Sequence, residues 1–219
     1  TAFREAVLGE EYRKKQKVAK TVLDEAALNI ENLFGYQLHQ APADHFTQSK
    51  FKDSYYLVNK IRDGAHCARV NATDGAATRG LLMVVLSFVY CSNYDNSNHK
   101  MPEKELKKQL DNLHKWDSAK ATQETFGVSS LQDILDLFVK QHYLVREKDT
   151  RADHQKESVL EAGPRAFIEI GRKQLVSFSY QAAGMDVDPV AIQAIEDEQA
   201  EEEGGGEDEE GGGDGEEES

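Results

Sequence analysis

GLLMVVLSFVY, residues 80–90, is the longest apolar run in a chain of 219 residues of which 30% are charged. The run is too short to cross a bilayer as a helix, which takes about 20 apolar residues, so it predicts a buried core element. Its periodicity fits a helix or a buried strand. Good helix formers such as Leu81, Met83 and Leu86 favour a helix, and the helical segment that follows needs a partner to pack on. We therefore expect residues 80–90 to form the central helix of a small domain.

A polar loop over residues 91–100 and a second helix are expected next. Pro102 suits the first turn of a helix, where its missing N–H costs nothing. The helix that follows has an apolar face and a basic face: Leu106, Leu110 and Leu113 on the first, and Lys104, Lys107 and Lys108 on the second. The sequence then predicts a loop through Trp116 and Gly127.

A third helix, a hairpin and a last helix complete this region. Ser129 or Ser130 can cap the third helix, whose apolar stripe consists of Leu131, Ile134, Leu135, Phe138 and Val139. Residues 143–148 and 156–162 read as two strands around a turn. Gly163-Pro164 then opens a last helix that ends near Gly184, with an inner side of Phe167, Ile170, Gln174, Leu175 and Phe178. Three helices followed by a hairpin describe a winged helix.

Residues 1–62 predict a related unit. Apolar residues recur at helical spacing over residues 17–34, and Gly35 is placed to end that helix. Residues 36–40 and 54–61 are rich in aromatic and β-branched side chains and predict one hairpin. A helix followed by a hairpin is the second half of a winged helix, so we expect a first module that lacks its first helix. Residues 63–79 are small, polar and aperiodic and predict a linker.

The charge of the chain is concentrated at one end. The formal net charge is −14, and 14 of the 40 acidic residues lie in residues 196–219, which hold no Lys or Arg. The rest of the chain carries 26 basic residues against 26 acidic ones, so its balance is compatible with an anionic partner. Residues 185–219 lose apolar content and are expected to form a disordered acidic tail.

No catalytic or metal-binding pattern stands out. The two cysteines, Cys67 and Cys91, form no C-x-x-C pair and lack the histidine spacing of a zinc site, and two free thiols suit a reducing compartment. The Gly-rich runs of the tail lack the lysine of a phosphate-binding loop. His142 is better explained as a cation at a helix end than as a base. We expect a binding protein that is not an enzyme and has no cofactor or metal.

Five short motifs occur in an order that resembles the MAGE homology domain. They are Leu33-Phe34-Gly35-Tyr36, Tyr55-Tyr56-Leu57-Val58, Gly80-Leu81-Leu82-Met83-Val84-Val85-Leu86, Tyr143-Leu144 and Gly163-Pro164-Arg165-Ala166. The resemblance covers roughly residues 4–182, and Ala162 departs from it because the family usually has an aromatic residue there. Within the family, the chain is most similar to the non-SMC element three subunits of the SMC five-six complex.

The resemblance implies a mainly α fold with small β-hairpins, in which tandem winged helices are followed by the acidic tail. The modules would be residues 1–62 and 80–184. It also implies a nuclear, chromatin-associated scaffold in DNA repair and recombination, with no membrane association. This scaffold would bind a RING-type ubiquitin-ligase subunit and a kleisin subunit, contact the SMC ATPase heads indirectly, and bind double-stranded DNA without sequence preference.

Basic residues near the second hairpin are the candidates for contacts with DNA phosphates: Lys140, Arg146, Lys148, Arg151 and Lys156. The alternative is that they are ordinary solvated positions. Asp133 and Asp136, on the face of the third helix that would read bases, would repel phosphate. Sequence-specific readout is therefore not expected, and this also argues against the alternative function, a stand-alone winged-helix transcription regulator.

Apolar residues left over from small winged-helix cores predict grooves for partner helices. For the kleisin the candidates are Leu131, Leu135, Phe138, Val139, Val176 and Phe178, and for the RING partner they are Val18, Val22 and Leu23. The alternative for each residue is that it fills the core.

Overall fold

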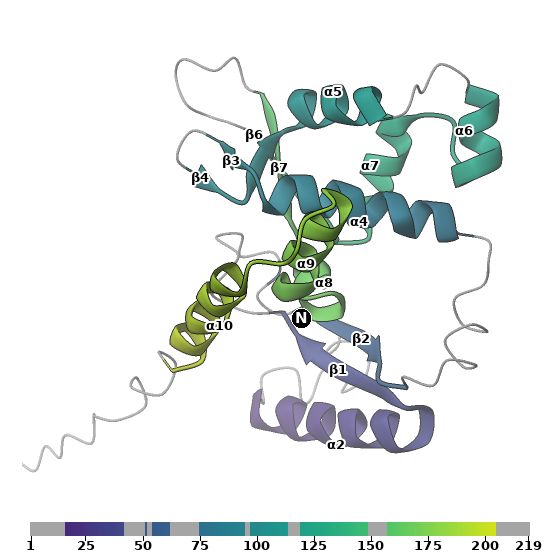
Figure 1. Ribbon diagram of the computed structural model, residues 1–219. Helices are drawn as coiled ribbons and strands as arrows, with labels where there is room; N and C mark the ends of the chain where they lie inside the picture. The colour runs from purple at the N-terminus through teal and green to yellow at the C-terminus, as the bar shows by residue number, and fades with distance from the viewer. Residues whose placement is uncertain are drawn as a thin grey trace, which may run out of the picture. The chain divides into compact units, whose positions relative to one another are not determined.

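The computed structural model describes residues 16–41, 51, 54–61, 75–94, 97–113, 119–148 and 157–204. The chain divides into two compact units, residues 1–76 and residues 77–219, and Figure 1 labels their elements. In chain order these are α2 (Gln16–Phe34), β1 (Tyr36–Gln40), β2 (Tyr55–Asn59), α4 (Ala76–Tyr90), β3 (Asn93–Tyr94), β4 (Ser97–Asn98), β5 (Lys100–Pro102), α5 (Glu103–Leu113), α6 (Ala119–Phe126), α7 (Leu131–Lys140), β6 (Leu144–Lys148), β7 (Ser158–Ala162), α8 (Pro164–Glu169), α9 (Arg172–Ala182) and α10 (Pro189–Gly204).

In the described part of the first unit, a helix is followed by a two-stranded hairpin, as the sequence predicts. The expectation that a first helix is missing concerns the chain before α2, where residues 1–15 lie outside the described residues. Strands β1 and β2 pair antiparallel, with Tyr36 opposite Asn59. Gly35 ends α2 with φ of +69°, a conformation that glycine adopts without strain. A Cβ added there would lie 2.7 Å from the Ile61 side chain, so the same glycine also allows the hairpin to approach the helix. An ion pair between Lys60 and Glu31 joins the hairpin to α2.

The central element of the second unit is α4, and the prediction that the long apolar run is a helix is confirmed. Val85, Leu86 and Val89 have no exposed surface, and they form a common core with apolar residues of α5, α7, α8 and α9 and of the sheet. The helix begins at Ala76. Residues 76–79 are therefore helical rather than linker, and residues 62–74 lie outside the described residues.

The second unit contains a five-stranded sheet with the order β4-β3-β5-β7-β6. The predicted hairpin is confirmed, since β6 and β7 pair antiparallel with Leu144 opposite Ala162. The polar loop expected over residues 91–100 instead contains the short strands β3 and β4 and the start of β5. Pro102 was expected in a helix but is the last residue of β5, opposite Val159.

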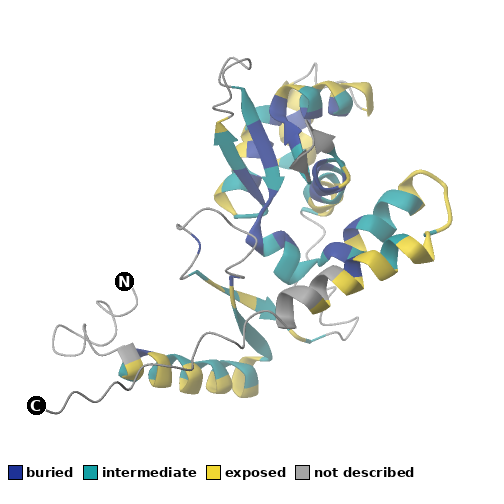
Figure 2. Ribbon diagram, turned by 90° about the vertical axis from the view of Figure 1, so that its left-hand side faces the viewer, coloured by how far each residue is buried: buried dark blue, intermediate teal, exposed yellow. Residues whose placement is uncertain are grey.

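The helices of the second unit differ in detail from the prediction. Helix α6 occupies part of the segment expected to be a loop. Leu106 and Leu110 are buried on α5, but Leu113 is 64% exposed because it is the last residue of that helix. The cap of α7 is confirmed, because the Ser130 side chain accepts a hydrogen bond from the Asp133 N–H. Figure 2 shows the buried faces of these helices turned toward the sheet and toward each other.

The expected last helix is two helices. Gly171, with φ of +87°, separates α8 from α9, because this backbone conformation cannot continue a right-handed helix. Gln174 was expected on the inner side but is exposed, whereas Leu175 is fully buried. Residues 189–204 form α10, so a helix extends into the segment for which disorder was expected. Residues 205–219 lie outside the described residues.

Candidate functional site

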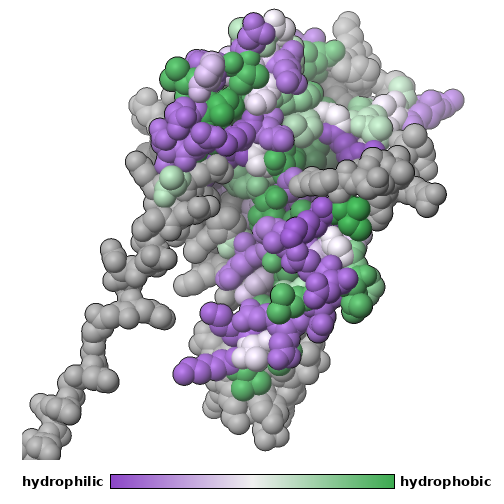
Figure 3. Space-filling model, turned by 60° about the horizontal axis from the view of Figure 1, so that its bottom comes forward, coloured by the Kyte–Doolittle hydropathy of each residue, from purple (hydrophilic) through white to green (hydrophobic). Residues whose placement is uncertain are grey.

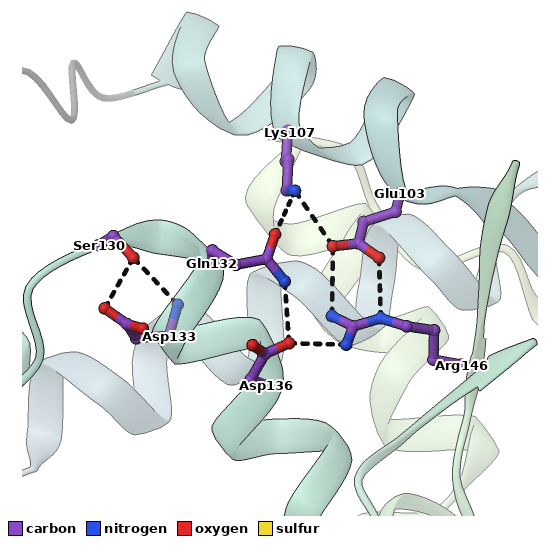
Figure 4. A network of polar contacts seen from close by, with 7 residues as sticks. All are labelled: Glu103, Lys107, Ser130, Gln132, Asp133, Asp136 and Arg146. Carbon is purple, nitrogen blue, oxygen red and sulfur yellow. Dashed lines mark hydrogen bonds and ion pairs between the residues drawn. The ribbon is translucent and has the colours of Figure 1, made fainter.

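A polar network joins strand β6 of the β6–β7 hairpin, the wing of the second unit, to helices α5 and α7 (Figure 4). Its centre is Arg146 on β6, whose Nε lies 2.8 Å from Oε2 of Glu103 and whose Nη2 donates to Oε1 at 3.2 Å. Nη1 of the same guanidinium lies 2.6 Å from Oδ1 of Asp136 on α7. Arg146 thus fixes strand β6 against the start of α5 and the middle of α7.

A second cation closes the network. The Lys107 Nζ lies 3.1 Å from Oε1 of Glu103, one helical turn away, and donates a hydrogen bond to the side chain of Gln132. The Gln132 amide in turn donates to Oδ1 of Asp136 at 2.8 Å. Lys107, which the sequence places on the basic face of this helix, is therefore part of the network. Its i, i+4 spacing from Glu103 was the available sequence signal.

The network determines how two of its carboxyl groups titrate. Burial alone would raise the pKa of Glu103, which is only 7% exposed, but the hydrogen bond from Lys107 and the charge of Arg146 outweigh burial and lower that pKa. For Asp136, the desolvation effect is likewise outweighed by the hydrogen bond from Arg146, and its pKa is lowered. Both groups are therefore held as carboxylates at neutral pH.

The DNA-binding candidates fall into three groups. Lys140, in the last turn of α7, and Lys148, at the end of β6, are exposed. Arg146 is directed into the network, where its guanidinium pairs with two carboxylates, and this pairing disfavours a contact with phosphate. Arg151 and Lys156 lie outside the described residues. The assignment of the two exposed lysines to DNA stays a prediction.

The candidates for the kleisin groove also divide. Leu131, Leu135 and Phe138 are at most 8% exposed. They fill the core around α4, which is the alternative to a groove for these residues. Their spacing on α7 marks a core-facing stripe, and sequence alone could not distinguish this from a groove. Val139 and Val176 are half-buried at the edge of the core, and Phe178 on α9 is half-buried. These three remain candidates for a partner contact.

The RING-partner candidates lie on α2 of the first unit. Val18, Val22 and Leu23 are half-buried there. This unit has apolar side chains that are more exposed and were not proposed as partner contacts from the sequence: Leu28, Leu33, Phe34, Tyr55 and Leu57, each at least 42% exposed. Four of these belong to the motifs Leu33-Phe34-Gly35-Tyr36 and Tyr55-Tyr56-Leu57-Val58, which were used only as family signatures. On the face shown in Figure 3, hydrophobic patches are interleaved with hydrophilic ones.

The Gly163-Pro164-Arg165 corner supports the second unit. Gly163 donates its N–H to the Tyr143 carbonyl at 2.7 Å, and a Cβ added to Gly163 would lie 2.3 Å from the His142 carbonyl oxygen. The Arg165 guanidinium lies 4.7 Å from the centre of the Tyr143 ring and pairs with Glu169 at 2.7 Å. Burial raises the pKa of Tyr143, and its hydroxyl donates to Glu169. The corner is thus a packed joint between β6, β7 and α8.

Other kinds of site find little support in the part of the chain that the structure describes. No cluster of three or more His, Cys, Asp or Glu side chains there could hold a metal ion. No described helix has both the length and the apolarity needed to cross a membrane. Cys91 is an exposed free thiol whose Sγ lies 3.2 Å from the Ser179 Oγ, and Cys67 lies outside the described residues.

Comparison with known proteins identifies the family. Curated protein sequences give no significant match. Among solved structures, a chain of the Nse1-Nse3-Nse4 complex is similar in fold, with a TM-score of 0.61 and 22% sequence identity over 90% of this chain and 84% of that one. The model of the MAGE homology domain matches residues 1–173, which confirms the resemblance noted in the sequence. The chain is therefore a member of the MAGE homology domain family.

Proposed function

We propose that this chain is a non-catalytic scaffold subunit of the SMC five-six complex, which joins a RING-type ubiquitin-ligase subunit to a kleisin subunit. The observation that carries the proposal is the fold similarity to a chain of the Nse1-Nse3-Nse4 complex over 90% of this chain. The family match over residues 1–173 supports the same assignment. The proposal places the protein in the nucleus, on chromatin, in DNA repair and recombination.

The partner contacts are assigned to different units. The RING-type subunit binds the first unit at α2, where Val18, Val22 and Leu23 are half-buried. The kleisin binds the second unit at the half-buried residues Val139, Val176 and Phe178. A half-buried apolar side chain supports this role because a partner can remove its remaining surface from water, which favours binding. The SMC ATPase heads are reached through the kleisin.

Auxiliary binding of duplex DNA is part of the same proposal. Lys140 and Lys148 are exposed at the end of α7 and on the wing strand β6, where phosphate contacts supply affinity without reading sequence. The Asp136 carboxylate in the middle of α7 is half-exposed and held in its charged form, which opposes approach of a phosphate backbone to that part of the helix rather than to its last turn at Lys140. This observation disfavours the alternative function of a sequence-specific regulator.

Co-expression provides the test. The full chain is produced with a RING-type subunit and a kleisin subunit from the same organism, and the mixture is analysed by size-exclusion chromatography with light scattering. We expect one complex that contains one copy of each subunit. Recovery of the chain alone, with neither partner, would reject the scaffold function. Recovery as a homodimer on one preferred DNA sequence would instead support a transcription regulator.

A further inference from the structure

Helix α10 folds back onto α9 within the second unit. The two helices contact each other, and Figure 2 shows them joined by the exposed turn that precedes α10. Lys173, in the first turn of α9, forms an ion pair with Glu196 in the middle of α10. Because the helices are connected at the opposite end of α9, this ion pair requires α10 to run back along α9.

The ion pair identifies the face of α9 that α10 approaches. Residues three, four and seven positions apart lie on one face of a helix, so Val176 and Tyr180 share the face of Lys173. Both are half-buried. Val176 is also one of the residues assigned above to the kleisin. The chain's own helix therefore lies along the surface proposed for a partner helix.

The attachment of α10 is slight. Ile195 is 7% exposed, and it is the single buried residue among the α10 side chains that the structure describes. The ion pair beside it joins two side chains that are 41% and 43% exposed, and exposed ion pairs add little stability because water screens them. Val190, at the start of the helix, is 74% exposed. Few contacts therefore have to break when α10 leaves α9.

We propose that α10 is a removable cover over the Val176 face of α9, so that the chain occupies its own partner site until a partner displaces it. The side chains of α10 also indicate the chemistry of the partner segment that would displace it. Ile195 is buried on α10, and Glu196, which follows it directly, pairs with Lys173. The pattern expected on this face is therefore an apolar side chain followed by a carboxylate. The displacing segment is an amphipathic helix with that pair of side chains. Its identification with the kleisin rests on the proposed function, whereas the cover itself does not.

A peptide with the sequence of residues 187–204 tests the cover without any partner. Anisotropy of the labelled peptide is measured on the full-length chain, as wild type, as Ile195→Asp and as Ala194→Asp. Ala194 is exposed, so its variant adds the same charge to α10 without removing the buried contact. We expect the Ile195→Asp chain to bind about tenfold more tightly than the other two, because its α9 face is vacant for a larger fraction of the time. Equal affinities for all three chains would overturn the proposal.

Two further variants guard against misfolding and against a non-specific effect. Glu196→Lys disturbs the ion pair without placing a charge in a buried position, and it should also increase peptide binding. Lys173→Glu should weaken binding of the peptide to the Ile195→Asp chain severalfold, since it replaces the cation that Glu196 contacts with a carboxylate that repels Glu196. Unchanged binding in the Lys173→Glu chain would show that the peptide does not use the α9 face, and would contradict the cover.

A kleisin fragment then tests the regulatory consequence. We expect it to bind the Ile195→Asp chain about tenfold more tightly than the wild type, by the same competition. Equal affinity for both chains would reject competition between α10 and the kleisin, and weaker binding to the variant would show that α10 is part of the binding surface. If the fragment binds neither chain while the peptide distinguishes them, the proposed function fails and the cover stands.

Discussion

Arg146 and Glu103 form a two-point ion pair between the wing strand β6 and the start of α5, with Nε 2.8 Å from Oε2 and Nη2 3.2 Å from Oε1. Substitution of Arg146 by Met leaves Glu103 buried with Lys107 as its remaining cation. We expect a loss of about 1–3 kcal/mol in the free energy of unfolding, the usual cost of an unsatisfied buried polar group. Urea denaturation at pH 7 measures it. Lys148→Met, at an exposed site on the same strand, should stay within about 0.5 kcal/mol of the wild type.

The pairing of Arg146 also determines which variants can test DNA binding. Charge reversal at Arg146 would disturb the fold, so a loss of binding there would have two explanations. Lys140→Glu with Lys148→Glu avoids this problem, because both lysines are exposed. We expect weaker binding of a random duplex and a salt slope reduced by about 0.9 for each lost phosphate contact. Lys120→Glu, on the exposed face of α6, serves as the control for charge reversal at a lysine that is not a DNA candidate. Equal slopes for all three chains would remove the DNA contact from the proposal.

The lowered pKa of Glu103 makes stability depend on pH in a definite direction. In the unfolded chain this group titrates near its ordinary value of 4.5, and in the folded chain it titrates lower. The stabilising effect is therefore complete above about pH 5 and is lost as the pH falls through the folded pKa. We expect Glu103→Gln to be less stable than the wild type at pH 7 and to show a smaller fall in the free energy of unfolding between pH 5 and pH 3. Urea melts across this range measure the difference, with Glu105→Gln as the control on the same helical turn. If the free energy of unfolding of Glu103→Gln falls with pH in parallel with that of the wild type, the interpretation is wrong.

The parts of the fold that the sequence predicts correctly are those set by local signals. The apolar run predicts α4, and Ser129 or Ser130 predicts the start of α7. Aromatic and β-branched residues predict the first hairpin, and alternation predicts the second. Each of these signals depends on neighbours within one helical turn or one strand. Strand β5 could not be predicted this way, since Pro102 fits a helix start locally and is placed in a strand by its pairing with Val159. The break between α8 and α9 follows from Gly171, whose left-handed conformation gives no signal in a segment with continuous helical spacing.

The candidate site was harder to predict than the fold for the same reason. Arg146 is one of several basic residues near the hairpin, and its spacing does not reveal that Glu103 and Asp136 come from elements 43 and 10 positions earlier. Likewise, an apolar stripe such as Leu131, Leu135 and Phe138 looks the same whether it faces a core or a groove. Only the placement of α4 against α7 distinguishes the two cases.

Gly163 offers a prediction about the family motif. A methyl group at this position would lie 2.3 Å from the His142 carbonyl oxygen, a backbone atom that cannot move aside as a flexible side chain would. We expect Gly163→Ala to lower the free energy of unfolding by at least about 2 kcal/mol, within the range for overpacking a closely fitted site. Gly80→Ala is the matched control, because nothing lies within 4 Å of the added methyl on α4. It should stabilise the chain by about 0.5–1 kcal/mol. A Gly163→Ala chain as stable as the wild type would show that the close approach is absent in solution.

Substitutions of Phe178 and Phe138 can distinguish a partner contact from a core contact. Phe138 is 1% exposed, so Phe138→Ala should cost about 3–5 kcal/mol of stability and weaken every property of the second unit together. Phe178 is half-buried on α9, so Phe178→Ala should cost less stability and yet reduce kleisin binding, because a partner would bury the rest of its ring. Gln174→Ala, at an exposed site one turn earlier on α9, should change neither. Isothermal titration of a kleisin fragment, together with urea melts of the same three chains, distinguishes the two roles. If Phe178→Ala binds the fragment as tightly as Gln174→Ala does, the kleisin does not use this part of α9, and its contact has to be sought around Val139.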